Sequence, residues 1–307
     1  MANINGDGNF TSRLNQVLSA SILGTLAYIS AFDIFLSITA CLGNTLIPVS
    51  LRKATSVHPP TKLLFRCLAV TDLGVGLIVQ PLYATLIMSP LIKMNGIFMI
   101  SRVRVAQSWI FCGVSILTSA AISVDRLLAL LLGLRYRHIV TLRRVRVVII
   151  CFWFIGVSLG STRIPRSDVA LKAASTLVSL PLVISIFCYT RIFFKLRHQQ
   201  AQVQSHVPQV QANEREIPVN VVRYKKSVSS ILWVQLVLVA CYAPWGIAVV
   251  LSVSGIENIE SWLVTLTLAY FNSSLNPILY CWKIRAVRQA VKDTIRQLSC
   301  LSFFLNN

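Results

Sequence analysis

Hydrophobic residues along the chain gather into long runs, and short polar segments separate one run from the next. A run of about 18 or more residues with few charges is typical of a transmembrane helix, because about 20 residues cross the hydrocarbon core of a bilayer. The pattern predicts an all-α fold, a seven-transmembrane helix bundle, with six or eight spans as the alternatives. The expected spans are 25–51, 60–87, 97–131, 144–161, 170–196, 227–253 and 259–281.

Two segments outside these spans have compositions of their own. Residues 198–222 are rich in Gln and contain Pro208 and Pro218, which predicts a flexible polar loop. From Lys283 to Leu298 bases alternate with apolar residues, which predicts a short amphipathic eighth helix on the cytoplasmic membrane surface. We therefore divide the chain into an N-terminal tail (1–24), a transmembrane domain (25–281) and the amphipathic helix with the tail (282–307).

The chain carries a formal net charge of +19, from 29 Lys and Arg residues against 10 Asp and Glu. A charge of this size suggests nucleic acid as a partner, but its distribution favours a membrane topology instead. With seven spans and an extracellular N-terminus, most of the Lys and Arg fall in cytoplasmic segments, which is the positive-inside bias. We expect a multi-pass protein of the plasma membrane, with a basic cytoplasmic face that attracts anionic lipid headgroups and with no nucleic-acid partner.

Two modification sites follow from this topology. Asn9-Phe10-Thr11, in the expected extracellular tail, is a glycosylation sequon with Asn9 as the acceptor. Cys300, just beyond the amphipathic helix, is a candidate for palmitoylation. All eight cysteines lie in predicted spans or on the cytoplasmic side, so we expect no extracellular disulfide framework.

Polar residues inside the predicted spans are few, and such residues usually face the interior of a bundle or a water-filled cavity. The informative ones are Asn44, Asp72, Ser115, Asn272 and Asn276. Together they predict a small oxygen-rich cavity around one carboxylate, which suits a hard monovalent cation or a protonated carboxyl. The alternative is a polar network that only holds the helices together.

Prolines interrupt the backbone hydrogen bonding of three spans. Pro277 leaves a carbonyl without its usual N–H donor, and we expect Asn276 to reach that carbonyl, with Tyr280 one turn further on a similar face. Pro181 and Pro244 weaken the fifth and sixth spans locally, which predicts hinges there.

At the cytoplasmic end of the third span, Asp125 stands next to Arg126. The carboxylate is expected to hold the guanidinium in an ion pair that a conformational change releases. The alternative is an arginine that simply extends to the membrane surface.

Taken together, these residues resemble the rhodopsin-like (class A) G-protein-coupled receptors over about residues 43–298. Each motif falls in a different span and in the order of that family. The motifs are Gly43-Asn44, Leu68-Ala-Val-Thr-Asp72, Asp125-Arg126-Leu127, Trp153, Pro181 with Tyr189, Cys241-x-x-Pro244 and Asn276-Pro277-x-x-Tyr280. The resemblance implies a receptor that binds an extracellular ligand and activates a heterotrimeric G protein.

The resemblance also implies roles for these residues. The five polar residues around Asp72 would form a sodium pocket that favours the inactive state, so sodium is an allosteric ion and no cofactor is expected. Arg126 would swing out to meet the G-protein α-subunit, while the sixth helix moves outward about Pro244. The implied coupling and switch residues are Asp125, Arg126, Tyr189, Pro244, Tyr242, Pro277 and Tyr280.

The chain departs from the family at several positions. Tyr242 stands where the family usually has a tryptophan toggle, and Leu127 where it usually has a tyrosine. Tyr224 stands where an acid often locks the third helix to the sixth, which predicts raised activity without ligand. Tyr270 and Ser108 replace the lysine of retinal receptors and the aspartate of amine receptors, which argues against light and against a monoamine ligand.

The outer end of the bundle resembles one branch of the family. Ser101 replaces the cysteine that usually tethers the third helix to the second outer loop, and that loop, at about 161–170, is short and free of cysteine. Both features resemble the melanocortin, lysophospholipid, cannabinoid and adenosine receptors. Arg104 aligns with an arginine by which lysophospholipid receptors bind phosphate, which favours an anionic or lipid-like ligand. Alternatively, Arg104 is an interfacial anchor or pairs with Asp33. The predicted ligand-binding residues are Arg104, Ser108, Asp33 and Tyr270.

Three other classes compete with this interpretation. A transporter also places polar groups at mid-membrane, but no internal repeat is visible. A receptor-like protein without G-protein signalling would keep the fold, although Arg126 and the Asn276-Pro277 motif argue against it. An enzyme is not expected, since the four histidines lie in loops and neither a His-Glu-x-x-His motif nor paired catalytic aspartates are evident.

Overall fold

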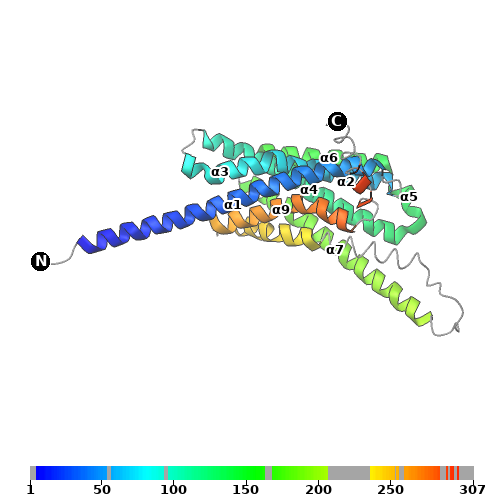
Figure 1. Ribbon diagram of the computed structural model, residues 1–307. Coiled ribbons are helices and arrows are strands. Elements are labelled where there is room, and N and C mark those ends of the chain that lie inside the picture. The colour runs from blue at the N-terminus through cyan, green and yellow to red at the C-terminus, as the bar shows by residue number, and fades with distance from the viewer. Residues whose placement is uncertain are drawn as a thin grey trace, which may run out of the picture.

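Long helices lie side by side in the protein, as its computed structural model shows (Figure 1). The structure describes residues 5–53, 57–92, 96–162, 168–206, 236–252, 254–255 and 259–283, with 288–289, 291–293 and 296 beyond them. In chain order the elements are α1 (Asn5–Lys53), α2 (Pro59–Gly74), the π-helix η1 (Val75–Val79), α3 (Gln80–Ile92), α4 (Ile97–Leu132), the 3-10 helix η2 (Gly133–Arg135), α5 (Tyr136–Ile139), α6 (Leu142–Thr162), α7 (Asp168–His206), an unlabelled helix over Leu236–Ser252, and α9 (Ile259–Lys283). The described residues contain no strand, and the all-α prediction is confirmed.

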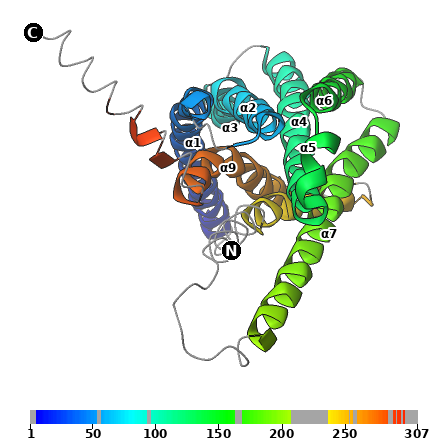
Figure 2. The ribbon, with the colours of Figure 1, turned by 90° about the vertical axis from the view of Figure 1, so that its right-hand side faces the viewer.

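α4 runs through the middle of the bundle. It contacts α2, α3, α6 and α7, while α1 packs against α2, α3 and α9. Figure 2, which looks along the bundle, shows α6 and α7 on one side of α4 and α1 with α9 on the other. α6 and α7 both pack on α4 but scarcely touch each other.

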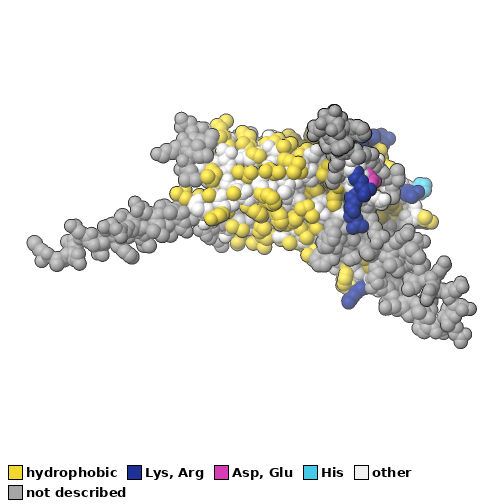
Figure 3. Space-filling model, viewed as in Figure 1, with side chains coloured by type: hydrophobic (Ala, Val, Ile, Leu, Met, Phe, Trp, Pro, Cys, Tyr) yellow, Lys and Arg dark blue, Asp and Glu magenta, His cyan; other side chains and the backbone are white. Residues whose placement is uncertain are grey.

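The outer surface of the bundle is apolar along its length. Large hydrophobic side chains such as Phe35, Leu42, Phe154 and Phe187 are exposed there, and yellow side chains cover the middle of Figure 3. Such a surface is the one that lipid covers around a helix bundle. Among the described residues, four segments are long and apolar enough to cross a membrane by length and composition: Leu23–Arg52, Pro59–Ser89, Ile97–Ile139 and Val178–His198.

Described arginines are concentrated at one end of the bundle. Arg126, Arg137, Arg143 and Arg144 lie there, and the dark blue side chains visible in Figure 3 gather towards that end. We refer to it as the basic end.

Two helices extend beyond the predicted spans, although the part of α1 that could cross a membrane, Leu23–Arg52, agrees with the predicted first span at 25–51. α1 begins at Asn5 rather than near residue 25, because the polar residues before the apolar run include no proline that would stop the helix. α7 continues to His206, so the first part of the predicted flexible loop at 198–222 is helical. Gln and Ala, which dominate residues 199–204, are good helix formers, and the first proline comes only at Pro208.

The second predicted span forms as expected but contains a π-helix, η1, at its centre. There the backbone of Gly76 lies against α1, where a Cβ would stand 3.0 Å from the Cβ of Ala40 and from the Sγ of Cys41. The hydroxyl of Ser37 donates to the Gly76 carbonyl at 2.7 Å. Ser37 of α1 therefore supplies a donor to a carbonyl of the π-helical turn, where the regular α-helical hydrogen bonding is interrupted.

Buried apolar side chains form two main clusters, one near each end. The larger one is aromatic and contains Tyr83, Trp109, Tyr242, Trp245 and Tyr270. The smaller one lies towards the basic end and includes Ile47, Leu68, Tyr136, Leu279 and Val291. Val291 belongs to the predicted amphipathic helix at 283–298; its described pieces, 288–289, 291–293 and 296, are helical, and the rest lies outside the described residues.

Candidate functional site

Asp72 is the centre of a buried polar cluster that joins α2, α4 and α9. Its side chain is fully buried. The carboxylate accepts hydrogen bonds from Ser115 Oγ at 3.1 Å and from Ser273 Oγ at 2.9 Å on one oxygen, and from Asn276 Nδ2 at 2.7 Å on the other. Three donors from two neighbouring helices thus fix the position of one carboxylate. Asp72, Ser115 and Asn276 come together as the sequence predicted.

The carbonyl that Pro277 leaves free is satisfied by a different residue from the one expected. Proline lacks the N–H that would bond the carbonyl four residues earlier, which is that of Ser273. Asn44 of α1 donates to this carbonyl through Nδ2 at 2.9 Å. The prediction that Asn276 reaches it is wrong, because the amide of Asn276 is used on Asp72.

Close contact between α1 and α9 makes this bond possible. A Cβ added to Gly43 would lie 2.7 Å from the Cβ and Cγ of Pro277. Glycine at this position therefore lets the two helices approach until Asn44 reaches across. The sequence motifs Gly43-Asn44 and Asn276-Pro277 belong to one contact.

Asn272 lies one turn along α9 from Asn276 and on the same face. It is fully buried, and neither its Oδ1 nor its Nδ2 has a hydrogen-bond partner among the described residues. A buried amide without partners is costly, and a bound ion or water usually satisfies it. Among the described residues no three His, Cys, Asp or Glu side chains gather as metal ligands. An ion at this cluster would thus rest on one carboxylate and neutral oxygens, which suits a monovalent cation.

The second group of polar residues lies at the basic end around Arg126. Its Nε donates to Asp125 at 3.1 Å, its Nη2 forms an ion pair with the same carboxylate, and Nη2 also donates to Thr61 at 2.6 Å. The arginine side chain is 25% exposed and that of Asp125 only 3%. The predicted ion pair is present, and we refer to this group with Tyr136 as the arginine lock.

Tyr136 of α5 completes the arginine lock. Its hydroxyl donates to the second oxygen of Asp125 at 2.6 Å, while Thr61 donates to the first at 3.0 Å. The ring of His58 lies tilted against that of Tyr136, with ring centroids 5.3 Å apart. Burial lowers the pKa of His58, and the nearby Arg137 and Arg126 lower it further against the opposing effect of Asp125. The imidazole is therefore neutral near pH 7 and adds no charge to the lock.

The remaining switch residues are placed as follows. Tyr189 of α7 donates to Ser123 at 3.3 Å, one helical turn before Arg126. Tyr242 is fully buried in the aromatic cluster, and its ring centroid lies 6.4 Å from that of Trp245. Pro244 precedes Trp245 in the same helix, Leu236–Ser252. Trp245 in turn lies 5.3 Å from Trp109 of α4. The side chains of Asn9 and Tyr280, together with Tyr224 and Cys300, lie outside the part of the chain that the structure describes.

The predicted ligand-binding residues lie at the end of the bundle opposite the basic end. Ser108 and Tyr270 share a hydrogen bond of 3.0 Å, and Arg104 donates to the Tyr270 hydroxyl at 3.4 Å. The Arg104 guanidinium also lies over the ring of Tyr83, 5.5 Å from its centroid. Tyr83 meets Tyr270 edge to face at 5.3 Å. Arg104, Ser108 and Tyr270 are therefore brought together as one group.

Asp33 belongs to a neighbouring pair and not to that group. It is fully buried on α1 and accepts a hydrogen bond of 3.3 Å from Gln80. No ion pair links Asp33 to Arg104, both of which the structure describes, so this alternative for Arg104 is wrong. Asp33 Oδ2, Gln80 Oε1 and Arg104 Nε are buried without a hydrogen-bond partner in the described structure.

Comparison with known proteins decides which family this architecture represents. The sequence pattern of the family described as 7 transmembrane receptor (rhodopsin family) matches residues 43–167 and 161–280. The chain belongs to this family. It is a multi-pass membrane protein of the rhodopsin-like class of G-protein-coupled receptors, and the matched region contains both the Asp72 cluster and the arginine lock.

Individual relatives of the receptor are distant but similar along most of their length. Melanocortin receptor 5 of Rattus norvegicus is 26% identical over 283 residues, which cover 86% of this receptor and 84% of the relative. Adenosine receptor A3 of Ovis aries is 24% identical over 291 residues, with 86% and 88% covered. Histamine H2 receptor of Homo sapiens is 27% identical over 284 residues, with 84% and 75% covered. Relatives named for three chemically different ligands are thus about equally similar, so identity alone does not select a ligand.

Three residues of the site were missed in the sequence. Ser273 precedes Pro277 by one turn and shares a span with Asn276, so its place beside Asp72 had a signal that was not used. Thr61 lies in the first turn of α2, at the start of the second predicted span, and Tyr136 lies in α5, after the third span. Nothing local in the sequence connects them to Asp125, because their contact depends on how α5 folds back beneath α2.

Proposed function

We propose that the receptor lies in the plasma membrane with its N-terminus outside, binds an extracellular ligand, and activates a heterotrimeric G protein at its basic end. The observation that carries this proposal is the arginine lock. Arg126 is bonded to Asp125 and Thr61 at the basic end, and its side chain is partly exposed, so a partner can reach it. A guanidinium that leaves one carboxylate offers five donors to a partner.

In this proposal the arrangement with these contacts formed is the closed, inactive one. Arg126, Thr61 and Tyr136 all bond to Asp125, so opening requires these contacts between α2, α4 and α5 to separate. A ligand shifts this equilibrium only through its different affinity for the closed and open arrangements. α9 connects the two ends, because it carries Tyr270 near the proposed ligand and Ser273 with Asn276 at Asp72.

Sodium is the proposed allosteric ion of this receptor. The residues present fit it: Asp72 supplies the only charge of the cluster, Ser115 and Ser273 supply hydroxyl oxygens, and Asn272 has an unpartnered carbonyl oxygen. The ion would supply positive charge to the buried carboxylate and thereby hold α2, α4 and α9 together. Asp72, Asn44, Ser115, Asn272 and Asn276 remain the proposed residues of this site.

Replacing Arg126 with Ala is expected to abolish G-protein activation, because the group proposed to leave Asp125 and meet the G protein is then absent. The measurement is ligand-free G-protein activation in cells across the four α-subunit classes, at matched surface expression. Arg146→Ala is the matched control, since it removes the same charge from an exposed residue of the same end. A basal signal that survives in Arg146→Ala and disappears in Arg126→Ala supports the proposal and names the pathway.

Equal signals from Arg126→Ala and wild type would contradict the proposed role of Arg126 in G-protein activation. If wild type, Arg126→Ala and Arg146→Ala all give no G-protein signal at normal surface levels, the result would favour a receptor-like protein without G-protein signalling. In that case, uptake that depends on a proton gradient would indicate a transporter.

Arg104 is the proposed contact for an anionic or lipid-like ligand. It is half-buried, its Nε has no partner among the described residues, and its bond to Tyr270 is long at 3.4 Å. An anionic group is a stronger partner than a phenol, because hydrogen bonds between opposite charges are about twice as strong as neutral ones.

Replacing Arg104 with Ala is expected to lower agonist potency about tenfold or more, as the loss of a charge-assisted hydrogen bond implies. Concentration–response curves of the first identified agonist provide the measurement. Arg102→Ala is the control, since Arg102 lies on the same turn of α4, with its guanidinium over Phe98. Unchanged potency in Arg104→Ala would rule out an anionic contact at this residue.

A further inference from the structure

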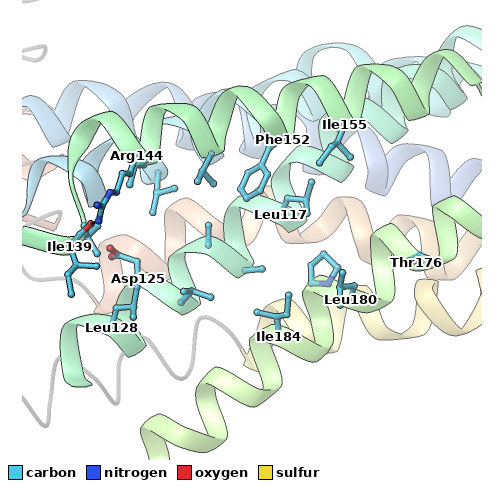
Figure 4. Close-up of a pocket in the computed structure, with 18 of the residues that line it drawn as sticks. Leu117, Asp125, Leu128, Ile139, Arg144, Phe152, Ile155, Thr176, Leu180 and Ile184 are labelled. Carbon is cyan, nitrogen blue, oxygen red and sulfur yellow. Dashed lines mark hydrogen bonds between the residues drawn. The ribbon is translucent and has the colours of Figure 1, made fainter. Parts of the chain in front are cut away.

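A cavity lies on the outside of the bundle, between α6 and α7, with α4 as its floor (Figure 4). Its volume is about 790 Å³. It exists because α6 and α7 both pack on α4 while hardly touching each other. Ala120 and Ala121 form part of the floor, and their small side chains deepen it. We call this cavity the α6–α7 groove.

The lining of the α6–α7 groove is apolar except at its ends. Of the residues that line it, only Asp125, Arg144 and Thr176 are polar. Figure 4 shows Arg144 and Asp125 at one end, with Ile155, Leu180 and Thr176 towards the other. An apolar surface with charge confined to one end suits an amphiphile, whose chain replaces water along the groove and whose headgroup stays at the end.

The length of the groove matches one leaflet of a bilayer. Arg144 and Ile155 are three turns apart on α6, which is about 16 Å along the helix axis. Half of a hydrocarbon core of about 30 Å is about 15 Å. A chain that lies in the groove from the basic end therefore reaches the middle of the membrane.

The charge at the basic end of the groove is positive. Asp125 is already neutralised, since Arg126 forms an ion pair with it and Thr61 and Tyr136 donate to it. Arg144 is exposed and donates one bond, from Nη1 to the Ile139 carbonyl at 2.8 Å. A guanidinium carries five donors, so most of its capacity remains for a phosphate at the mouth of the groove. Arg143 and Arg146 are exposed on the same two turns of α6 and add to the positive field.

We propose that the α6–α7 groove binds one anionic phospholipid, with an acyl chain over Ala120 and Ala121 and the headgroup phosphate on Arg144. Because the receptor spans a membrane, lipid is the occupant that surrounds the groove at all times. The assignment to the cytoplasmic leaflet rests on the proposed topology, whereas the binding itself does not. The bound lipid would lie beside Asp125 and thus next to the arginine lock.

Two variants test the two halves of this site. Arg144→Gln removes the headgroup partner, and Arg146→Gln is its control, since Arg146 is exposed on the same helix and does not line the groove. Leu180→Trp fills the groove from a position that is 55% exposed, so the core is not overpacked. Val183→Trp is its control, because Val183 is 61% exposed on the same helix and lies outside the groove.

The measurement is native mass spectrometry of the whole receptor purified in micelles that contain equal amounts of phosphatidylserine and phosphatidylcholine. Wild type is expected to retain phosphatidylserine about tenfold over phosphatidylcholine. Arg144→Gln should bring that ratio close to one, and Leu180→Trp should lower the retention of both lipids about fivefold. The control variants should stay within about twofold of wild type, and soluble glycerophosphoserine should not displace the lipid, because it lacks the chains.

Both lipids carry a phosphate, but only phosphatidylserine has a net negative charge. Equal retention of the two by wild type would therefore overturn the proposal that the groove selects an anionic phospholipid. Equal losses in Arg144→Gln and Arg146→Gln would show a diffuse charge effect instead of a site. Full retention in Leu180→Trp, or displacement by glycerophosphoserine, would overturn the groove as the place of the acyl chain. None of these results depends on G-protein signalling, so a failure here is distinct from a failure of the proposed function.

Discussion

Replacing Asp125 with Asn is expected to raise the ligand-free activity of the receptor about tenfold, because the closed arrangement loses its charge-assisted hydrogen bonds while the open one loses none. In the closed form one carboxylate accepts from Arg126, Thr61 and Tyr136. An Asn side chain has a single accepting oxygen, so it cannot accept from all three donors. The equilibrium therefore shifts towards the form in which Arg126 is free.

The measurement is ligand-free G-protein activation at matched surface expression. Asp293→Asn is the control, since Asp293 is exposed near the C-terminal end and its replacement removes the same charge. Tyr136→Phe removes only one neutral donor from the same carboxylate, so it should raise activity about threefold. A rise in Asp125→Asn without any in Tyr136→Phe would show that Tyr136 does not stabilise the closed form. No rise in either variant would show that the arginine lock does not limit activation.

Apolar runs predicted well where the described residues form helices, since a membrane requires each span to satisfy its own backbone hydrogen bonds. α4 and α6 begin and end within a few residues of the predicted positions. The ends of α1 and α7 were not predictable in the same way, because the membrane no longer dictates structure beyond the apolar run. Beyond the apolar run the intrinsic helix propensity of the residues decides. The Gln-rich composition of residues 199–204 was read as a flexible loop, but Gln and Ala also favour a helix, and the segment is helical.

The polar residues of the site were predictable as types but not as pairs. Asp72, Ser115 and Asn276 meet because polar groups in a bundle turn inward, which the sequence already implies. Which donor reaches which acceptor depends on how closely two helices approach. Gly43 lets α1 approach Pro277, so Asn44 takes the Ser273 carbonyl and Asn276 is left for Asp72. Likewise, Tyr136 joins Asp125 only through the short 3-10 turn η2, which redirects the chain after α4.

Replacing Asp72 with Asn is expected to remove the response of the receptor to sodium, since the variant keeps the shape of the side chain and loses the only charge of the cluster. In wild type, a sodium concentration ten times the dissociation constant should raise the melting temperature of the purified receptor by about 3 °C, as a ligand that binds only the folded form does. Potassium or choline chloride at the same ionic strength should have less effect.

Asp33→Asn is the matched control, because Asp33 is the other fully buried carboxylate described on α1 and α2, and its variant should keep the sodium response. A sodium response that persists in Asp72→Asn, or that disappears in Asp33→Asn, would place the ion elsewhere. If wild type itself does not respond, the buried amide of Asn272 is satisfied by water, and the Asp72 cluster acts only to hold the helices together.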